Sequence, residues 1–555
     1  MIKENFVKLY EGVLKENWAL PAFTNYEEGR TYTVADVARW AARVHLILEQ
    51  NGIKKGDKVT LIGKDCAEWC MVWMGIVTYG AVVVPILPDF PKADLLHLIE
   101  HSDSKFVFVG PEHEKHLEGA LLPNVLGLYR IKSMEPLLGL LSNDPTKAHN
   151  IDALFKERYP NDFTREDVKF PEVSNEEVVL ISYTSGTSGF SKGVMTTANN
   201  LAANMTYAVT EKMQSRGDRL LCFLPNAHAY SCAFNFLLPL LSGAHVYILG
   251  QKPTPTILLK ALKEVQPRLI LSVPLVLEKI YKSVVTPKLK ETSVRLALKT
   301  PILRNSVYKK FREGLIQALG GNLGEIIIGG AALNAEVAQF LDRIKFPYTV
   351  GYGMTECAPL VSYAQYKNYV SGSCGKELKM IEKLRVADAQ EIEGQMVGEI
   401  QVKGENVCLG YYKNPQATAE LFTEDGWMKT GDLGYIAKDG SVFLRGRSKA
   451  MLLGPNGQNI YPEEIEAKIA MLPFMNEAVV VQREGKRNVA IVTIDRKALE
   501  KAGYKNDKKV EELLESNRKQ LNESLASFAQ ISSFEVLEGD FEKTPKQSIK
   551  RYLYK

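Results

Sequence analysis

Six short apolar segments recur along the first 330 residues of the chain, and helical patterns separate them. Each segment is apolar on both faces, which is typical of strands in parallel sheets that helices cover on both sides. The sequence therefore predicts a large α/β domain of helix-covered, mainly parallel sheets. The six segments are Lys58–Gly63, Lys105–Gly110, Val178–Gly186, His245–Gly250, Leu269–Pro274 and Glu325–Gly330.

The 555 residues exceed the roughly 250 to 300 at which one hydrophobic core stops growing, so we expect at least two domains. From about Val397 the pattern changes to shorter antiparallel signals, including two strands joined by a turn at Asp439-Gly440. After Arg447, about a hundred residues have strands and a helix of their own. We predict an N-terminal domain of residues 1–447 and a small α+β domain of residues 448–555.

The elements expected in this small domain are two strands and one amphipathic helix. The strands are Ala478–Gln482 and Asn488–Ile494, and Asn506 is expected to cap the helix. One face of that helix is apolar, through Val510, Leu513, Leu514, Leu521 and Leu525. By contrast, the polar stretch from Ser142 to Asn175 lacks periodicity and is expected to be a connecting loop region.

Charge and cysteine usage exclude several classes of protein. The net charge of +4 gives no dominant basic field, so we expect no nucleic-acid partner. Seven cysteines without a paired CxxC argue against a disulfide framework or a structural zinc site, and they fit a reducing cytoplasm. Residues Cys70–Leu87 carry no charge, but Gly75, Gly80 and Pro85 interrupt them. This stretch therefore favours a buried helix followed by a buried strand over a transmembrane helix.

The stretch SYTSGTSGFSKGV, Ser182–Val194, begins at the end of the third apolar segment and suits a polyphosphate ligand. Its glycines allow close backbone approach, and its hydroxyls and one lysine can bind phosphate oxygens. A serine- and glycine-rich surface loop is the alternative, and the spacing is not that of a P-loop because Ser191 precedes Lys192. The candidate ligands are Thr184, Ser185, Gly186, Thr187, Ser188, Gly189 and Lys192.

Two downstream motifs carry further candidates. In GYGMTE, Gly351–Glu356, the ring of Tyr352 can stack on a base, Thr355 can donate to a phosphate and Glu356 can hold Mg²⁺. Gly353 and Met354 lie between them. In WMKTGD and RGRSK, Asp432 suits ribose hydroxyls and Arg447 can assist. Taken singly, Glu356 and Asp432 are more typical of solvated or capping carboxylates.

Taken together and in this order, the motifs resemble the adenylate-forming superfamily of acyl-CoA synthetases, luciferases and peptide-synthetase adenylation domains. The resemblance covers nearly the whole chain, and seven ordered motifs are far more specific than any one of them. They are YTSGTSGFSKG, LPNAHAY, GGAAL, GYGMTE, KTGD, RGRSKAMLLGPNGQNIYPEEIE and EKTPKQSIKR. The likeness implies a large N-terminal domain of helix-covered sheets plus a β-barrel-like subdomain, followed by a small mobile C-terminal domain.

The resemblance also implies a two-step reaction. A carboxylate attacks the α-phosphorus of Mg-ATP to give an acyl-adenylate and pyrophosphate, and a thiol, usually that of coenzyme A, then displaces AMP. By similarity, the loop from Thr184 to Lys192 cradles the pyrophosphate end, Thr355 contacts the α-phosphate, and Glu356 binds Mg²⁺. Adenine lies among Gly330, Ala331, Ala332 and Tyr352, and the ribose lies on Asp432 and Arg447. The small domain rotates between the steps about Lys449.

The substrate is inferred from the acyl-pocket region. Leu224–Leu240 contains no acidic residue, whereas amino-acid-activating relatives use an aspartate there, so an amino acid is disfavoured. His228 resembles the residue that borders the acyl pocket, although a packed core histidine is the alternative. VPLVLEKIY and GPNGQNIYPEEIE look most like long-chain fatty acyl-CoA synthetases. A medium or long fatty acid is expected, with ATP, Mg²⁺ and coenzyme A as cofactors.

Other outcomes stay open at this point. The chain can load a separate acyl carrier protein, or it can be a nucleotide-binding pseudoenzyme. Peripheral membrane contact and oligomeric state are also open.

The chain departs from the family pattern at the final motif. Relatives place a catalytic lysine immediately before an isoleucine, whereas Ser548 precedes Ile549 here. If the segment is extended, positions 546 and 548 face the same side, so Lys546 can reach the same pocket. We hypothesise that Lys546 takes the catalytic role, with Lys543 and Lys550 as alternatives.

Overall fold

The computed structural model describes residues 2–184, 191–453, 458–483, 487–504, 506–544 and 548–554. The chain forms two compact units. The first contains residues 2–184, 192–383 and 402–428, and the second contains residues 384–401 and 429–554. The predicted domain boundary between Arg447 and Ser448 stays a prediction. In the structure, the C-terminal unit also includes the stretch 384–401 and begins again at Lys429.

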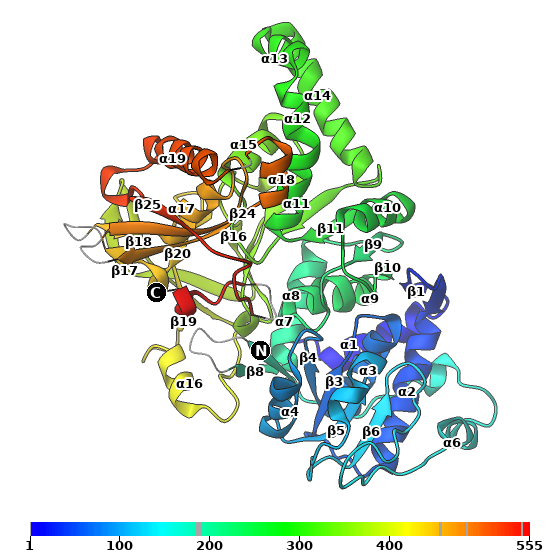
Figure 1. Ribbon diagram of the computed structural model, residues 1–555. Coiled ribbons are helices and arrows are strands. Elements are labelled where there is room, and N and C mark those ends of the chain that lie inside the picture. The colour runs from blue at the N-terminus through cyan, green and yellow to red at the C-terminus, as the bar shows by residue number, and fades with distance from the viewer. Residues whose placement is uncertain are drawn as a thin grey trace. The chain divides into compact units, whose positions relative to one another are not determined.

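The first unit is built on two large sheets (Figure 1). In the seven-stranded sheet, neighbouring strands run parallel except the edge pair β1 and β2. Its order is β13 (Tyr348–Val350), β12 (Glu325–Ile328), β11 (Leu269–Ser272), β9 (Arg219–Cys222), β10 (His245–Ile248), β1 (Pro21–Asn25) and β2 (Arg30–Thr33).

The six-stranded sheet is parallel except at its β7–β8 edge. Its order is β6 (Gly127–Arg130), β5 (Ser104–Val109), β3 (Lys58–Ile62), β4 (Val82–Ile86), β7 (Val178–Thr184) and β8 (Lys192–Thr197). All six predicted strands are therefore confirmed, as is the helix-to-strand order of the uncharged stretch, which forms α3 (Ala67–Tyr79) and β4.

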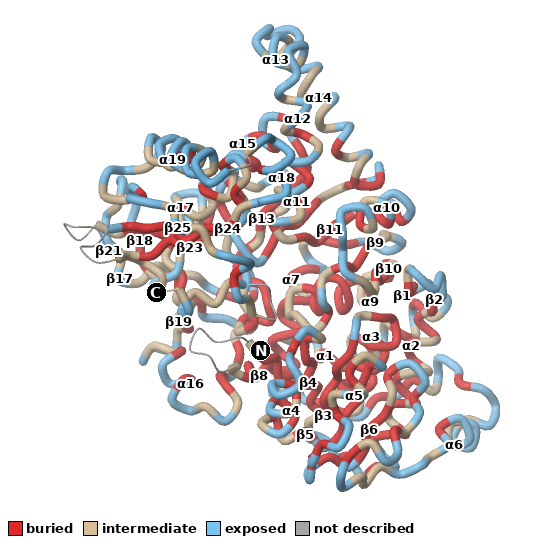
Figure 2. Tube along the Cα trace, in the orientation of Figure 1, coloured by how far each residue is buried: buried red, intermediate tan, exposed pale blue. Residues whose placement is uncertain are grey.

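Helices cover these sheets, and the core lies between the layers. Trp69 and Trp73 of α3 are fully buried there, and Figure 2 shows buried residues concentrated in the strands and in α2 and α3. Among the described residues, no helix is long and apolar enough to cross a membrane. The helices are α1 (Phe6–Glu16), α2 (Val34–Gln50), α3, α4 (Lys92–His101), α5 (Glu114–Leu117), α6 (Ile151–Arg158), α7 (Ala198–Thr210), α8 (Ala229–Ser231), α9 (Leu238–Ser242), α10 (Pro255–Val265), α11 (Pro274–Ile280), α12 (Thr286–Lys290), α13 (Thr292–Lys299), α14 (Pro301–Ala318), α15 (Ala335–Arg343) and α16 (Pro415–Leu421).

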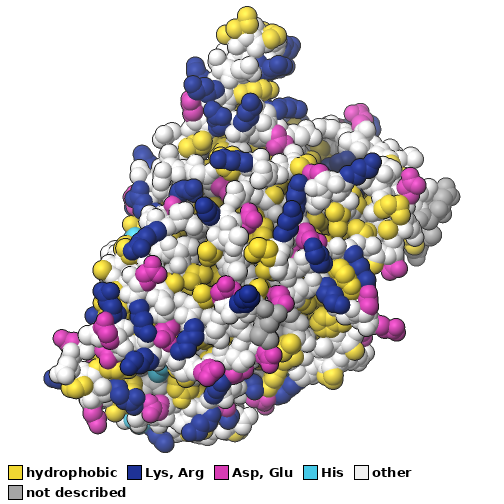
Figure 3. Space-filling view, turned by 180° about the vertical axis from the view of Figure 1, so that it is seen from behind, with side chains coloured by type: hydrophobic (Ala, Val, Ile, Leu, Met, Phe, Trp, Pro, Cys, Tyr) yellow, Lys and Arg dark blue, Asp and Glu magenta, His cyan; other side chains and the backbone are white. Residues whose placement is uncertain are grey.

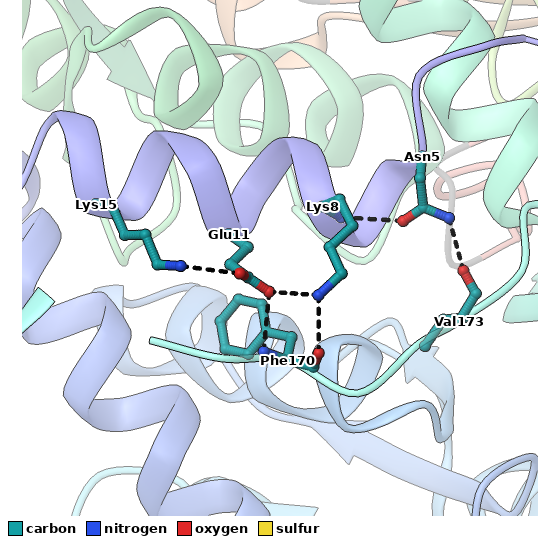
Figure 4. Close-up of polar contacts among 6 residues, drawn as sticks. All are labelled: Asn5, Lys8, Glu11, Lys15, Phe170 and Val173. Carbon is teal, nitrogen blue, oxygen red and sulfur yellow. Dashed lines mark hydrogen bonds and ion pairs between the residues drawn. The ribbon is translucent and has the colours of Figure 1, made fainter. Parts of the chain in front are cut away.

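The stretch 142–175 is not the featureless loop that its composition predicts. It contains α6 and a 3₁₀ turn at Arg165–Asp167. Two hydrogen bonds connect the end of this stretch to α1 and its N-cap (Figure 4). The side-chain amide of Asn5 donates to the carbonyl of Val173 at 2.7 Å, and the N–H of Phe170 donates to Glu11 at 3.0 Å.

Glu11 is the centre of this contact. Lys8 and Lys15 donate to its two oxygens at 2.7 and 2.9 Å (Figure 4). Burial alone raises the pKa of this carboxyl, but the hydrogen bonds from Lys8, Lys15 and the Phe170 N–H outweigh it and lower the pKa to about 2.

The strands between residues 352 and 447, where a β-barrel-like subdomain is expected, form a three-stranded and a four-stranded sheet. The first contains β14 (Tyr352–Gly353), β15 (Leu360–Tyr363) and β16 (Lys376–Glu377). The second contains β17 (Glu382–Ile392), β18 (Gln395–Gly404), β19 (Met428–Ile436) and β20 (Val442–Arg447). The predicted hairpin at Asp439-Gly440 joins β19 to β20, and Gly440 has the positive φ of 86° that such a turn needs.

The C-terminal residues form the α+β arrangement that their pattern predicts. Asn506 caps α19, accepting from the N–H of Lys509 at 3.0 Å, and Leu521 on its apolar face is buried. The strands are β21 (Leu452–Leu453), β22 (Asn459–Ile460), β23 (Met475–Arg483), β24 (Arg487–Ile494) and β25 (Ser533–Val536), with helices α17 (Pro462–Ile469), α18 (Arg496–Lys501) and α19 (Asp507–Glu523).

A buried carboxyl in the first unit gives a test of the fold. Glu382 is buried at the start of β17, where Asn406 donates to it at 2.5 Å and the Leu378 N–H at 3.3 Å. Burial raises the pKa of Glu382 well above its usual 4.5. Above pH 4.5 the folded state keeps a proton that the unfolded chain has released, so stability falls as the pH rises.

We expect Glu382→Gln to remove this part of the pH dependence, which is at most about 1.4 kcal/mol per pH unit. Urea unfolding at several pH values between 5 and 8, for the variant and the unchanged chain, measures the difference. Glu118→Gln at an exposed position controls for the loss of one surface charge. Parallel stability profiles for Glu382→Gln and the unchanged chain would contradict the expectation.

Candidate functional site

Three predicted elements of the site meet at one edge of the seven-stranded sheet. His228 follows β9, Gly330–Ala332 follow β12, and Tyr352 follows β13. These strands run parallel, and Ile328 at the end of β12 pairs with Val350 at the end of β13. Ligands of open α/β sheets bind outside the carboxyl ends of the strands, so this edge is the expected place for a nucleotide.

The residues predicted to enclose adenine differ in exposure. Gly330, Ala331 and Ala332 are exposed, and Gly330 has a φ of +88° that favours glycine. Tyr352 is buried, with 7% of its surface exposed, and lies in β14 opposite Ser362. The structure thus leaves Gly330–Ala332 exposed and encloses most of the Tyr352 ring, so only part of that ring is available for stacking.

The predicted phosphate loop joins the two strands of a hairpin. Thr184 ends β7 and Lys192 begins β8, and the two residues are paired across the antiparallel edge. The hydroxyl of Thr184 lies 3.5 Å from the carbonyl oxygen of Lys192. Ser185, Gly186, Thr187, Ser188 and Gly189 lie outside the described residues. The hairpin fixes the position of the lysine at one end of the loop.

A tyrosine connects this lysine to the predicted metal ligand. The ammonium of Lys192 lies 4.7 Å from the centre of the Tyr411 ring, and the Tyr411 hydroxyl donates to Glu356 Oε1 at 2.9 Å. The ring is buried and Glu356 is half-buried. Burial, together with the charge of Glu356, raises the pKa of Tyr411, so its hydroxyl keeps its proton as a donor at neutral pH.

Backbone pairing produces this arrangement. The segment 409–412 runs along β8: Met195 donates to the carbonyl of Gly410 at 2.9 Å, and Tyr412 donates to that of Gly193 at 2.8 Å. The N–H of Cys408 also donates to the carbonyl of Glu356 at 2.8 Å. Sequence reasoning missed Tyr411, because its only signal is an aromatic pair after a glycine, more than two hundred residues from Lys192.

Thr355 and Glu356 lie in a 3₁₀ turn, Thr355–Cys357. Thr355 is buried and lines a cavity of about 10 Å³ together with Ala229, Cys232 and Ala358. This is room for about one water molecule. The turn therefore places the hydroxyl predicted to contact the α-phosphate beside the apolar segment predicted to form the acyl pocket.

Asp432 and Arg447, both in the second unit, form the expected pair. They are directly opposite in the β19–β20 hairpin, and the guanidinium Nε lies 3.3 Å from Asp432 Oδ1. The carboxylate is buried, whereas the arginine side chain is 63% exposed. Lys449, the predicted hinge, is exposed in the 3₁₀ turn Ser448–Ala450 that follows.

Two family models match the chain in succession. The AMP-binding enzyme model matches residues 14–412, and the AMP-binding enzyme C-terminal domain model matches residues 450–554. The chain belongs to the AMP-binding enzyme family. The match begins before the first sheet and ends at the segment that carries Tyr411, so it includes the lysine, tyrosine and glutamate described above.

Proteins similar to this AMP-binding enzyme include ligases that form thioesters of coenzyme A. A long-chain-fatty-acid–CoA ligase, FadD15 of Mycobacterium bovis, is 28% identical over 94% of this chain and 89% of its own. Among solved structures, ATP-bound MatB from Rhodopseudomonas palustris has a TM-score of 0.75 at 21% identity, covering 99% and 98% of the two chains. The anthranilate CoA ligase AuaEII, in complex with anthranoyl-AMP, has a TM-score of 0.78 at 17% identity over 99% and 96%. The solved structures confirm the fold.

His228 has a local structural role in this AMP-binding enzyme. It is the N-cap of α8, where its Nδ1 accepts from the N–H of Tyr230 at 3.4 Å, and its side chain is half-buried. The tyrosine beside it donates to the carbonyl of Ile327 in β12 at 3.1 Å. The predicted role at the acyl pocket stays a prediction, and the histidine is not a fully packed core residue.

The described residues of the final motif pair with one another. Lys543 and Ile549 form an antiparallel bridge, and the N–H of Thr544 donates to the carbonyl of Ser548 at 2.8 Å. These contacts pair the described residues on the two sides of positions 545–547. The predicted role of Lys546 stays a prediction. Lys546 itself lies outside the described residues.

The two alternative lysines have acidic partners within the second unit. Lys543 lies 2.8 Å from Glu477, and Lys550 lies 3.5 Å from Glu542. Each of these two ammonium groups therefore has a carboxylate partner in the structure.

Gly353 of the GYGMTE motif has a structural reason to be glycine. A Cβ at this position would lie 2.5 Å from the carbonyl oxygen of Pro359, which already accepts from the N–H of Met354 at 2.8 Å. The backbone atoms on both sides belong to the turn that carries Thr355 and Glu356, so they cannot move apart without displacing it.

We expect Gly353→Ala to destabilise the protein by about 1 to 3 kcal/mol through this steric overlap. Thermal and urea unfolding measure the effect. Gly314→Ala is the matched control, because a Cβ on this exposed helical glycine meets nothing within 4 Å and should stabilise by up to about 1 kcal/mol. An unchanged stability for Gly353→Ala would contradict the steric argument.

Proposed function

We propose that this protein activates a medium- or long-chain fatty acid with ATP and then forms a thioester with coenzyme A. The contact series Lys192–Tyr411–Glu356 carries the proposal, since it holds a phosphate-binding cation and a metal-binding carboxylate on one aromatic ring. The long-chain-fatty-acid–CoA ligase that matches 94% of the chain supports the choice of substrate.

The first step forms an acyl-adenylate. A carboxylate oxygen of the fatty acid attacks the α-phosphorus of ATP, a new P–O bond forms, and pyrophosphate leaves with the electrons of the broken P–O bond. Lys192, with the hydroxyls from Thr184 to Ser188, holds the β- and γ-phosphates, and Thr355 contacts the α-phosphate. Gly330–Ala332 and Tyr352 enclose adenine, while Asp432 and Arg447 hold the ribose.

The residues present fit a magnesium ion. Among the described residues, no three His, Cys, Asp or Glu side chains come together as a metal site, so the other ligands would be phosphate oxygens and water, as is usual for Mg²⁺. Glu356 would hold the ion, and the hydrogen bond from Tyr411 fixes the orientation of the carboxylate. The ion would neutralise charge that develops on the phosphates.

In the second step the thiol of coenzyme A attacks the acyl carbonyl carbon and a C–S bond forms. The C–O bond between the acyl carbon and the phosphate breaks, AMP leaves with its electrons, and the thiol proton passes to water. We propose that Lys546 serves only the first step, because its ammonium is needed at the α-phosphate while the thiol needs the same space later. Rotation of residues 448–555 about Lys449 would remove it. Coenzyme A is favoured over a separate acyl carrier protein by the names of the relatives.

The acyl pocket and the location are part of the same proposal. The segment 229–242, which contains α8 and α9, carries no charged side chain and is largely buried. The cavity of about 10 Å³ beside Thr355 is too small for a fatty chain, so an acyl chain could enter there only if the side chains around it moved. All seven cysteines are buried and free, which supports a cytoplasmic location.

A panel of carboxylic acids tests the function. With ATP, Mg²⁺ and coenzyme A, we expect AMP release that depends on both acid and coenzyme A and is strongest for medium or long chains. The assay measures AMP for acids from short to very long. A carrier-loading enzyme would not respond to coenzyme A, a nucleotide-binding pseudoenzyme would release no AMP, and inactivity on every acid would contradict the proposal.

The catalytic lysine has its own test. We expect Lys546→Ala to reduce ATP–pyrophosphate exchange on the order of 100-fold, because the variant lacks a cation at the developing charge. Thioester formation from supplied acyl-adenylate should be unchanged. Lys543→Ala is the matched control, since the structure pairs that ammonium with Glu477. Exchange that survives in Lys546→Ala and is lost in Lys543→Ala would reassign the role.

A further inference from the structure

A helical projection stands out from the first unit (Figure 1). It consists of α12, α13 and α14, residues 286–318, and α13 and α14 meet at Thr300. Only one end of α14 is anchored: Phe311 packs edge-on against Phe340 of α15 with ring centres 5.5 Å apart, and Leu315 is buried. The opposite end, at the junction with α13, is exposed.

The projection concentrates positive charge. Residues 286–318 contain eight Lys and Arg against two Glu, a net charge of +6, whereas the whole chain has +4, which leaves −2 for the rest. Figure 3 shows these basic side chains along the projection. The basic residues are Lys288, Lys290, Arg295, Lys299, Arg304, Lys309, Lys310 and Arg312.

The junction of α13 and α14 carries large aliphatic side chains in water. Leu296 is 68% exposed, Ile302 is 86% exposed and Leu303 is 51% exposed. Figure 3 shows hydrophobic side chains at this end of the molecule. The core does not require them, because other residues face inward: Leu298 and Tyr308 line a cavity of about 260 Å³ beneath the helices.

We propose that this projection docks the protein on a membrane surface that contains anionic lipids. The aliphatic residues at the junction enter the boundary between headgroups and acyl chains, and the lysines and arginines around them bind the lipid phosphates. Helices that lie at a membrane interface combine exposed aliphatic residues with a basic polar face in this way. An acidic peptide or carrier protein would match the charge but leave the aliphatic residues without a partner.

A second copy of the chain is a weaker occupant. Three side chains at the end of a helix pair offer far less area than the roughly 800 Å² per partner that a stable interface buries. Two copies would also bring together two surfaces of charge +6. The membrane is the occupant that matches both the charge and the exposed aliphatic residues.

Binding of the full chain to lipid vesicles tests the proposal. We expect co-sedimentation with vesicles of phosphatidylcholine mixed with phosphatidylglycerol, weak binding to phosphatidylcholine alone, and release as salt increases. The double variant Leu296→Ser, Ile302→Ser should bind the mixed vesicles at least about 10-fold more weakly. Lys299→Glu should weaken binding about 10- to 30-fold, since it reverses one exposed charge next to the junction of α13 and α14.

The chain offers closely matched controls. Leu121 is 69% exposed, so Leu121→Ser removes an equally exposed leucine elsewhere. Lys260 of α10 is an exposed helical lysine like Lys299, so Lys260→Glu reverses one such charge elsewhere. Both controls should bind vesicles like the unchanged chain, and unfolding midpoints should be alike for all variants.

Other results would overturn the proposal. Equal losses in the control variants would show that binding has no fixed site. Equal binding to both kinds of vesicle would remove the role of the anionic headgroup. Concentration-dependent dimers that dissociate in the Leu296→Ser, Ile302→Ser variant, without vesicle binding by the unchanged chain, would assign the surface to a second copy. Because the readout is binding, failure here is distinguishable from inactivity in the ligase assay.

Discussion

The hydrogen bonds between β8 and residues 409–412 hold the candidate site together. They align β8, which begins at Lys192, with a segment that follows β18 of the four-stranded sheet, and Tyr411 of this segment contacts both Lys192 and Glu356. A lysine over an aromatic ring gains about 0.5 to 2 kcal/mol depending on its exposure. The phenol at the same time donates to the carboxylate. One side chain therefore orients two groups of opposite charge and keeps them from forming a direct ion pair.

This separation matters for phosphate chemistry. A lysine and a glutamate in direct contact would neutralise each other, and neither would be available for a polyphosphate and its metal ion. With Tyr411 between them, the cation and the carboxylate can act on different parts of the same ligand. The carboxyl-terminal edge of the neighbouring sheet adds exposed backbone at Gly330–Ala332. Lys192 lies in the six-stranded sheet, whereas Gly330–Ala332 follow a strand of the seven-stranded sheet in the same unit. The site therefore depends on the fold of the whole unit.

The parts that sequence reasoning predicted are those encoded locally. Strands that are buried on both faces, such as β3 and β12, can be predicted from continuous apolar runs. The start of α19 can be predicted because the side chain of Asn506 caps the helix. What it missed depends on partners far away in the chain. In α6 only Ile151 is buried, so the helix has no apolar stripe to detect. The bridge between Lys543 and Ile549 likewise cannot be predicted from the local pattern.

The glycines of the phosphate and GYGMTE motifs show how motif likeness and ligand contact differ. A Cβ on Gly193 would lie 3.0 Å from Ile181 and 3.2 Å from the ring of Tyr183, and one on Gly353 would lie 2.5 Å from the Pro359 carbonyl. Packing within the protein thus leaves no room for a Cβ at Gly353 and little room at Gly193, whether or not a nucleotide is present. Their place in a family motif is therefore no evidence of contact with ATP. The proposed contact with ATP therefore depends on the charged side chains. Lys192 and Glu356 both contact Tyr411, and Arg447 pairs with Asp432.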